Sequence, residues 1–241
     1  MASADPAPRK VLILGGGFGG VSAAQTLDKL RGASRDAIDV TLVSQTNYLL
    51  FYPMLAEAAS GGVELTHILS PLRRQLPNVS VRVEEIQSVD LQAHTVETRD
   101  AATRETHILD WDALVIALGS SVNLAGMPGV AEHGLPFKTI GDALNIRNRA
   151  MHMVEAAAAI ADHEERLPLL TFVVCGAGFS GVEMAAELYD YLIDSIGLYP
   201  SIDTSEIHVI LLQGGERILP ELSEGLARFA HRKLQERGVE V

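Results

Sequence analysis

The stretch "VLILGGGFGG", residues 11–20, places an apolar run directly before five glycines in six positions. Three interpretations fit it: the apolar part of a secretion signal, a flexible loop, or a turn that binds a nucleotide phosphate. The signal interpretation is weak, because a glycine-rich run that ends before Asp28 falls short of the roughly 20 mostly apolar residues of a membrane span. The phosphate-binding interpretation makes the most specific demand on the neighbouring residues.

That interpretation requires glycines in G-x-G-x-x-G spacing between a buried strand and an amphipathic helix. Gly15, Gly17 and Gly20 have this spacing. Residues 10–14 predict the strand, and apolar residues recur at near-helical spacing from Val21 until Gly32, which predicts the helix. The first glycine allows the turn, the second lets backbone approach a pyrophosphate, and the third lets helix pack on strand. Free N–H groups at the helix start then face the phosphates.

A second copy follows in "LLTFVVCGAGFSGVEMAAEL", residues 169–188. Residues 169–175 predict the strand, Gly176, Gly178 and Gly181 repeat the spacing, and the predicted helix ends at Gly197. Each copy precedes a second strand, "DVTLVS" at 39–44 and "IHVILLQ" at 207–213, which makes both β-α-β units. Two complete matches favour two dinucleotide sites over two ligand-free turns.

The segments between the two copies predict the rest of the fold. "VSVRV", "EEIQSVDL" and "HTVETR" alternate like an antiparallel meander, and 114–118 reads as another buried strand that ends at Gly119. Residues 141–161 predict a long helix, and "DHEERLP" predicts a polar linker. We expect an α/β fold with two Rossmann-type units, an antiparallel meander in the first, and an incomplete second unit, because "VEV" begins a strand that stops at Val241.

Composition restricts the function. A net charge of −12 argues against nucleic-acid binding, which depends on Lys and Arg. The single cysteine, Cys175, excludes a disulfide framework and an internal redox-active pair, and it favours a reducing cytoplasm. The eight histidines lack metal-ligand spacing, so we expect no metal site.

Four ordered stretches carry a family resemblance: "NYLLFYPMLAEAASGG", "LPFKTIGDALNIRN", "GAGFSGVEMAAEL" and "ERILPELSEGLARFAHRKLQERGVEV". Together they resemble the type II NADH:quinone oxidoreductases, flavoprotein reductases with two dinucleotide-binding units. The resemblance implies FAD in the first unit and NADH or NADPH in the second. It divides the chain into an FAD-binding domain at 1–140 that lacks its C-terminal return segment, a connecting helix and linker at 141–168, and a partial NAD(P)H-binding domain at 169–241.

The resemblance also assigns site residues. The FAD contacts would be Gly15, Gly17, Phe18, Gly19, Gly20, Ser44, Pro53, Val83, Ala117 and Gly119. The NAD(P)H contacts would be Gly176, Gly178, Phe179, Gly181 and Gln213. Pro53 would lie near the flavin ring, although the aromatic stretch around it reads equally well as core. Glu183 would be a catalytic carboxylate on the nicotinamide side of the flavin. Alternatively, Glu183 has only a structural role, as a carboxylate that the helix dipole favours.

The sequence departs from the family pattern in two respects. A carboxylate is expected at the end of each second strand to bind ribose hydroxyls, but the chain has Ser44 and Gln213. Because neither repels a 2′-phosphate, the choice between NADH and NADPH stays open. Family members also continue beyond this length and end in a membrane-binding segment, so we expect the 241-residue chain alone to be inactive.

The expected reaction is hydride transfer from NAD(P)H to the flavin, followed by transfer of two electrons to a quinone. The resemblance implies a cytoplasmic protein, peripheral at the inner face of the cell membrane in its full-length form, and a possible homodimer. A soluble reductase that serves ferredoxin or another carrier is an alternative, as is a nucleotide-binding module without turnover.

Overall fold

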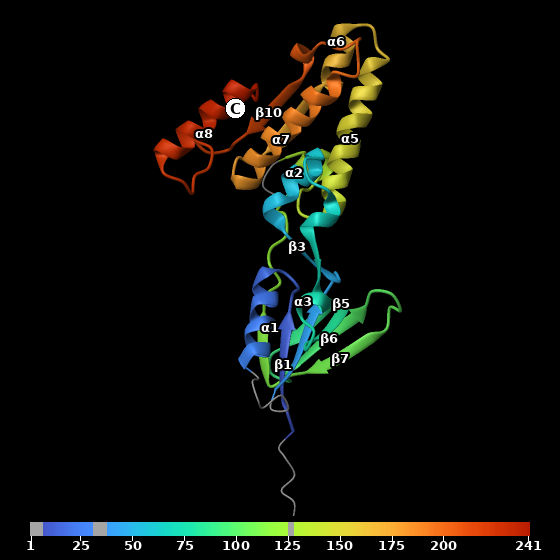
Figure 1. Ribbon diagram of the computed structural model, residues 1–241, viewed down its shortest axis with the longest axis vertical. Coiled ribbons are helices and arrows are strands. Elements are labelled where there is room, and N and C mark those ends of the chain that lie inside the picture. Colours follow the sequence, from blue (N-terminus) through green and yellow to red (C-terminus); the bar gives the residue numbers. More distant parts are fainter. Residues whose placement is uncertain (1–6, 31–37, 125–127) are drawn as a thin grey trace, which may run out of the picture. The chain divides into compact units, whose positions relative to one another are not determined.

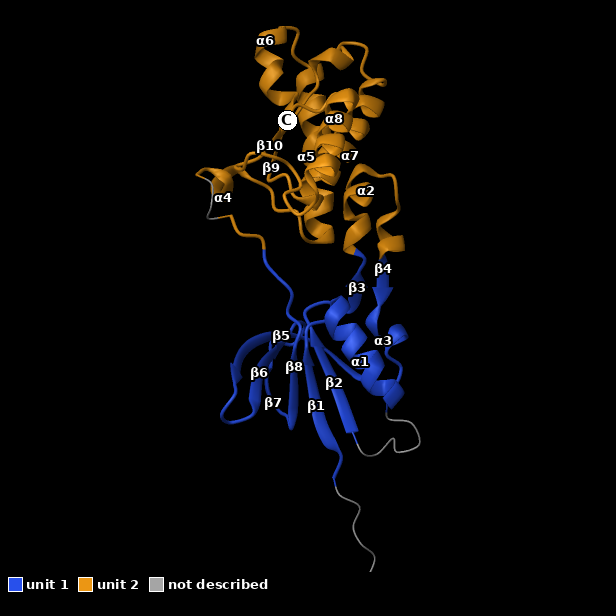
Figure 2. Ribbon diagram, turned by 90° about the vertical axis from the view of Figure 1, so that its left-hand side faces the viewer, with its two compact units in different colours: residues 1–51, 69–121 blue, residues 52–68, 122–241 orange. Residues whose placement is uncertain are grey.

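The computed structural model describes residues 7–30, 38–124 and 128–241. The chain forms two compact units, coloured separately in Figure 2. Unit 1 comprises residues 1–51 and 69–121, and unit 2 comprises residues 52–68 and 122–241. Both units contain strands and helices, so the predicted α/β class is confirmed.

Unit 1 is built on a mixed sheet of six strands in the order β7-β6-β5-β2-β1-β8. The strands are β1 (Arg9–Leu14), β2 (Ile38–Ser44), β5 (Ser80–Asp90), β6 (Thr95–Asp100), β7 (Thr106–Asp110) and β8 (Ala113–Ile116). The pairs β5–β2, β2–β1 and β1–β8 are parallel, and β5–β6 and β6–β7 are antiparallel. The parallel strands therefore end together at one edge of the sheet.

Both faces of the central strands β1 and β2 are covered (Figures 1 and 2). On one face, Val11 and Ile13 pack in a cluster with α1 (Phe18–Leu30) and α3 (Leu72–Gln75). On the other, Leu12 and Leu14 pack against residues of the antiparallel strands. A strand buried on both faces needs a continuous apolar run, which is what residues 11–14 provide. The predicted helix stop at Gly32 lies outside the described residues.

The antiparallel meander differs from its predicted boundaries. The segments "VSVRV" and "EEIQSVDL" were expected as two strands, but they form the single strand β5. Its first part pairs in parallel with β2, and its second part pairs antiparallel with β6 after a register shift near Ile86. No turn residue separates Val83 from Glu84, so the chain continues as a strand. The third strand, β7, was not predicted.

In unit 1, β3 (Tyr48–Leu50) and β4 (Leu69–Pro71) pair as a short antiparallel hairpin, and a long insertion separates the two strands in the sequence. This insertion, residues 52–68, belongs to unit 2 and contains η2 (Tyr52–Met54), α2 (Leu55–Ser60) and η3 (Leu65–Ile68). There α2 packs on α5 (Ile140–Ala158) and α7 (Phe179–Ile196). This grouping differs from the division at residue 140 expected from the sequence.

Unit 2 contains the second glycine-rich copy. Its parallel strands β9 (Thr171–Cys175) and β10 (His208–Leu212) pair, and the predicted strand at the chain end forms one parallel bridge between Ile210 and Glu240. The remaining elements are α4 (Val130–His133), α6 (His163–Arg166), η4 (Leu167–Leu169), η5 (Thr204–Glu206) and α8 (Glu224–Arg237). The segment expected as a linker is thus helical, because the Asp162 side chain caps α6. In the described part of the chain, no helix is long and apolar enough to cross a membrane.

A buried ion pair fixes α6 to η5. Arg166 Nε and Nη2 donate to the two carboxylate oxygens of Glu206 at 2.7 and 2.6 Å, and Glu206 is 6% exposed. The hydrogen bond from Arg166 lowers the pKa of Glu206, against the effect of burial. The ion pair therefore contributes its full stability at pH values above 4.5, the ordinary pKa of a glutamate. This contribution is lost as the pH falls through the lowered pKa of Glu206.

We predict that Arg166→Met destabilises the chain by about 3 kcal/mol at pH 7, because it leaves the buried Glu206 carboxylate without its guanidinium partner. The difference in the free energy of unfolding between Arg166→Met and the unmodified chain should become smaller below pH 4.5. Chemical denaturation at several pH values measures both effects. Arg228→Met is the matched control, since Arg228 pairs with Glu224 on the surface and such pairs contribute less than about 1 kcal/mol. Equal destabilisation by the two variants would contradict the prediction.

Candidate functional site: two glycine turns

The first glycine turn connects β1 to α1 in unit 1. Gly15 has a φ of 111°, and a Cβ atom there would collide with the carbonyl oxygen of Ala117. A Cβ on Gly20 would collide with the carbonyl oxygen of Gly15. Around Gly17, in contrast, a Cβ would meet nothing within 4 Å. Two glycines are thus required by the fold, and the middle one borders open space.

The second turn, between β9 and α7, repeats this geometry. Gly176 has a φ of 99°, a Cβ on Gly181 would collide with the Gly176 carbonyl oxygen, and a Cβ on Gly178 would meet nothing within 4 Å. The turns also share their backbone hydrogen bonds. Gly15 N–H donates to Val43 O and Gly176 N–H donates to Leu212 O, both at 2.8 Å. The repeat seen in the sequence is therefore a repeat of conformation.

Both turns can accept a pyrophosphate. The first turn of α1 and the first turn of α7 contain no acidic residue, so the positive end of each helix dipole is not neutralised there. Unpaired N–H groups at a helix start, beside a glycine with open space, form a binding site for phosphate. Gly17 and Gly178 leave the space that such a group needs.

Four of the predicted FAD contacts come together at the carboxyl edge of the unit 1 sheet. Ser44 pairs in register with Val83, and Ala117 N–H donates to Leu14 O directly before the turn at Gly15. Ser44 is buried, with its hydroxyl beside Gly16, where it accepts a hydrogen bond from Thr46 N–H at 3.3 Å. The structure thus brings these residues together, and their contact with FAD stays a prediction.

Aromatic side chains lie beside the first turn. Phe18, at the start of α1, contacts Phe51 edge-on with ring centroids 5.8 Å apart, and both rings are partly exposed. Gly119, two residues after Ala117, has a φ of 73° and borders open space. Pro53 lies in η2 of unit 2 and is exposed, so its predicted contact with the flavin ring stays untested.

Gln213 is tied to the second turn. Its side-chain oxygen accepts a hydrogen bond from Ala177 N–H at 2.9 Å. This bond orients the amide and leaves the side-chain NH₂ group as the donor for a ligand. Gln213 therefore helps to hold the turn, a role that the sequence did not indicate. Phe179, the first residue of α7, is half-exposed beside the same turn.

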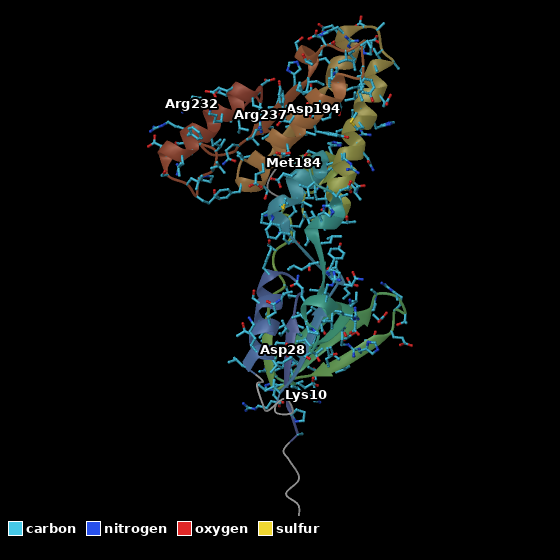
Figure 3. All side chains as sticks on the ribbon, viewed as in Figure 1. Lys10, Asp28, Met184, Asp194, Arg232 and Arg237 are labelled. Carbon is cyan, nitrogen blue, oxygen red and sulfur yellow. The ribbon has the colours of Figure 1, made fainter. Side chains whose placement is uncertain are left out.

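Glu183 lies beyond the first turn of α7, which begins at Phe179, and this position weakens the helix-dipole explanation for the residue. The residue as a whole is exposed, but partial removal of its carboxyl from water raises its pKa. The nearby charges of Glu57 and Glu187 raise it further. Figure 3 labels the neighbouring Met184 on the same helix.

A polar cleft of about 210 Å³ opens in unit 1 among the first residues of β1, β2 and β5 and the end of β7. None of its lining residues belongs to a glycine turn. Its cations are already paired, Lys10 with Asp110 and Arg82 with Glu84. We therefore place the functional site at the glycine turns.

Comparison with known proteins shows the family to which the chain belongs. The model of the pyridine nucleotide-disulphide oxidoreductase family matches residues 9–241. The type II NADH:quinone oxidoreductase NdhA of Mycobacterium tuberculosis is 36% identical over 96% of the chain and 48% of its own length. The external alternative NAD(P)H-ubiquinone oxidoreductase B1 of Solanum tuberosum mitochondria is 34% identical over 97% of the chain and 41% of its own length.

The fold of the chain is also similar to that of a solved structure. NDH2 of Plasmodium falciparum, solved in complex with NADH, is similar over 97% of the chain and 47% of its own length, with a TM-score of 0.85 and 26% identity. The chain therefore spans about half the length of the curated relatives and solved structures that it matches.

The open space at the middle glycines leads to a prediction. Gly17→Val should abolish FAD binding, and Gly178→Val should abolish NAD(P)H binding, because the new side chain fills the space for the pyrophosphate. We expect each affinity to fall more than about a hundredfold, or roughly 2.7 kcal/mol. Flavin absorbance after gel filtration measures the first effect, and titration of nucleotide fluorescence measures the second.

The control is Gly20→Ala, whose methyl group would collide with the Gly15 carbonyl oxygen and should destabilise the fold itself. Far-ultraviolet circular dichroism should therefore show intact Gly17→Val and Gly178→Val chains and a less stable Gly20→Ala chain. FAD bound to an intact Gly17→Val chain would show that this turn is not the FAD site.

Proposed function

We propose that this chain, which belongs to the pyridine nucleotide-disulphide oxidoreductase family, binds FAD at the first glycine turn and NAD(P)H at the second and passes electrons to a quinone. The observation that carries the proposal is the match between the two turns, with open space at Gly17 and Gly178. Similarity to type II NADH:quinone oxidoreductases supports the choice of acceptor.

The proposed reaction is NAD(P)H + H⁺ + quinone → NAD(P)⁺ + quinol. FAD, when bound, supplies the chemistry that accepts a hydride and releases two electrons. The protein supplies binding and orientation, which convert the encounter of donor and acceptor into a reaction between held groups. In this scheme Gly15, Gly17 and Gly20 hold one pyrophosphate, and Gly176, Gly178 and Gly181 hold the other.

The other assignments follow the same division. We assign to FAD the residues of unit 1 at the first turn and at the neighbouring strand ends: Phe18, Gly19, Ser44, Val83, Ala117 and Gly119. By the family resemblance we also assign Pro53 of unit 2 to FAD. Phe179 and Gln213 are assigned to NAD(P)H, and Glu183 to proton exchange near the reacting groups. We also propose peripheral attachment to the inner face of the cell membrane, and a homodimer, for the protein at the length of its relatives.

Nucleotide preference should depend on Gln213. The unmodified chain should bind NADH and NADPH with dissociation constants within about tenfold of each other, since a neutral amide does not repel a 2′-phosphate and can donate to it. Gln213→Glu keeps an acceptor for Ala177 N–H but adds a negative charge. The substitution should weaken the binding of NADPH relative to that of NADH by at least about tenfold, or about 1.4 kcal/mol.

Isothermal titration with each nucleotide measures this change in preference. The matched control is Gln235→Glu, which adds the same charge at an exposed position of α8 and should leave the preference unchanged. Strong preference for NADH in the unmodified chain would show that another residue excludes the phosphate, and our use of Gln213 would then be wrong.

Turnover tests the whole proposal. The chain and a version extended to the length of its relatives are each loaded with FAD and assayed with NADH and a short-chain quinone. We expect turnover in the extended version and little in the 241-residue chain, which spans 48% of NdhA. Flavin reduction without quinone reduction in the extended version would favour the soluble carrier reductase. Nucleotide binding with no flavin reduction would favour a module without turnover.

A further inference from the structure

The outward face of α8 in unit 2 carries two large apolar side chains. Leu226 is 55% exposed and Phe229 is 50% exposed, whereas Ala227 and Leu234 of the same helix are buried. Because an α-helix has about 3.6 residues per turn, Phe229 lies nearly opposite Ala227, and Leu226 is its neighbour one turn earlier. The helix therefore packs on unit 2 through one side and presents Leu226 and Phe229 to solvent.

Two cations lie against the Phe229 ring. The guanidinium carbon of Arg232 lies 5.6 Å from the ring centroid, and Lys233 Nζ lies 5.9 Å from it. Both side chains are more than half exposed, and Figure 3 labels Arg232 on the helix. Arg237, which Figure 3 also labels, pairs with Asp190 of α7 and lies outside this group. The exposed aromatic ring thus stands in a positively charged surrounding.

The acidic residues of α8 do not balance its cations. The helix contains four Arg or Lys residues and two Glu residues, so its net charge is +2, whereas the whole chain has a net charge of −12. Arg228 pairs with Glu224, but Arg232 and Lys233 share the one carboxylate of Glu236, at 3.8 and 2.6 Å. Since salt screens exposed charges beyond about 8 Å at physiological ionic strength, a partner at this face meets the local charge of α8.

This combination of side chains fits an anionic lipid surface. Leu and Phe side chains on a helix that lies at a membrane surface insert at the boundary between headgroups and acyl chains, and Lys and Arg beside them bind anionic headgroups. An acidic peptide would satisfy the cations but would leave the exposed Leu226 and Phe229 without a role. The apolar and the basic side chains on one face therefore favour a membrane over an acidic protein.

We propose that the outward face of α8, formed by Leu226, Phe229, Arg232 and Lys233, docks onto an anionic membrane surface, with the two apolar side chains inserted among the lipids and the two cations at the headgroups. This inference deepens the peripheral membrane attachment that we propose for the longer protein, and it rests on that proposal for its role. It assigns one membrane contact to a helix of this chain.

The test is flotation of the purified 241-residue chain with lipid vesicles, without nucleotide or quinone. We expect binding to vesicles of equal parts phosphatidylglycerol and phosphatidylcholine, and binding at least about tenfold weaker to phosphatidylcholine alone. Phe229→Ser should lower the partition coefficient on the anionic vesicles at least about fivefold, because it removes an inserted ring. Arg232→Gln combined with Lys233→Gln should lower it at least about tenfold, because it removes two charges near the headgroups.

Matched controls make the same chemical changes outside α8. Leu198→Ser removes an apolar side chain that is 82% exposed in the loop after α7. Arg74→Gln combined with Arg149→Gln removes two exposed positive charges, one on α3 and one on α5. Both controls should bind the anionic vesicles as the unmodified chain does, and circular dichroism should show every variant folded. If Phe229→Ser does not fold, Leu226→Ser takes its place with the same expected loss.

Absence of binding to the anionic vesicles would overturn the proposal, as would equal binding to both kinds of vesicle. Equal losses in the α8 variants and their controls would also overturn it. Polyglutamate that binds the chain and the Phe229→Ser variant equally, while vesicle binding is unchanged by Phe229→Ser, would identify an acidic protein as the partner and overturn the membrane. Because the measurement uses neither FAD nor quinone, failure of the proposed reaction in the turnover assay would leave its result unaffected.

Discussion

The contact on which the rest of the site depends is the approach of one glycine to another across each turn. The Cα of Gly20 lies against the carbonyl oxygen of Gly15, and the Cα of Gly181 lies against that of Gly176, so closely that neither position admits a Cβ. This contact holds the first turn of the helix against the end of its strand. The unpaired N–H groups of the helix consequently open at the carboxyl edge of the sheet, where the second strand of each unit also ends.

The predictable parts of the fold are those that depend on residues close together in the sequence. The buried strands, the long helices and both glycine turns follow from apolar period and glycine spacing, and each lies within a few residues of its predicted position. The meander was less predictable, because β5 changes partners along its length without a turn residue to mark the change. Likewise, α6 was predicted as a linker from its polar residues, but Arg166 pairs with the distant Glu206, and this pairing gives the polar segment a buried anchor.

The candidate site was predictable to a similar degree. Gly15, Ser44 and Ala117 meet because parallel strands end at one edge, which is a rule of topology rather than of sequence distance. The bond from Ala177 to Gln213 could not be predicted, because it depends on the reach of one side chain across two strand ends. Nor could the hydrogen bond from Ser60 to Glu187, since it requires α2 of the 52–68 segment to pack on α7.

The two turns share their glycine spacing, a positive φ at the first glycine and the same backbone hydrogen bond, so the glycines cannot by themselves distinguish one dinucleotide from another. The difference lies at the end of the second strand. Ser44 is buried, and its hydroxyl accepts from Thr46 N–H within its own loop. Gln213 is only partly buried, and its oxygen is engaged with the turn while its NH₂ group is directed by that bond. A dinucleotide bound as proposed would therefore meet an oriented amide donor at the second turn, whereas the Ser44 hydroxyl at the first turn is already engaged within its own loop. Discrimination between ligands must then come from these neutral residues and from the loops around them, and not from the phosphate-binding turns.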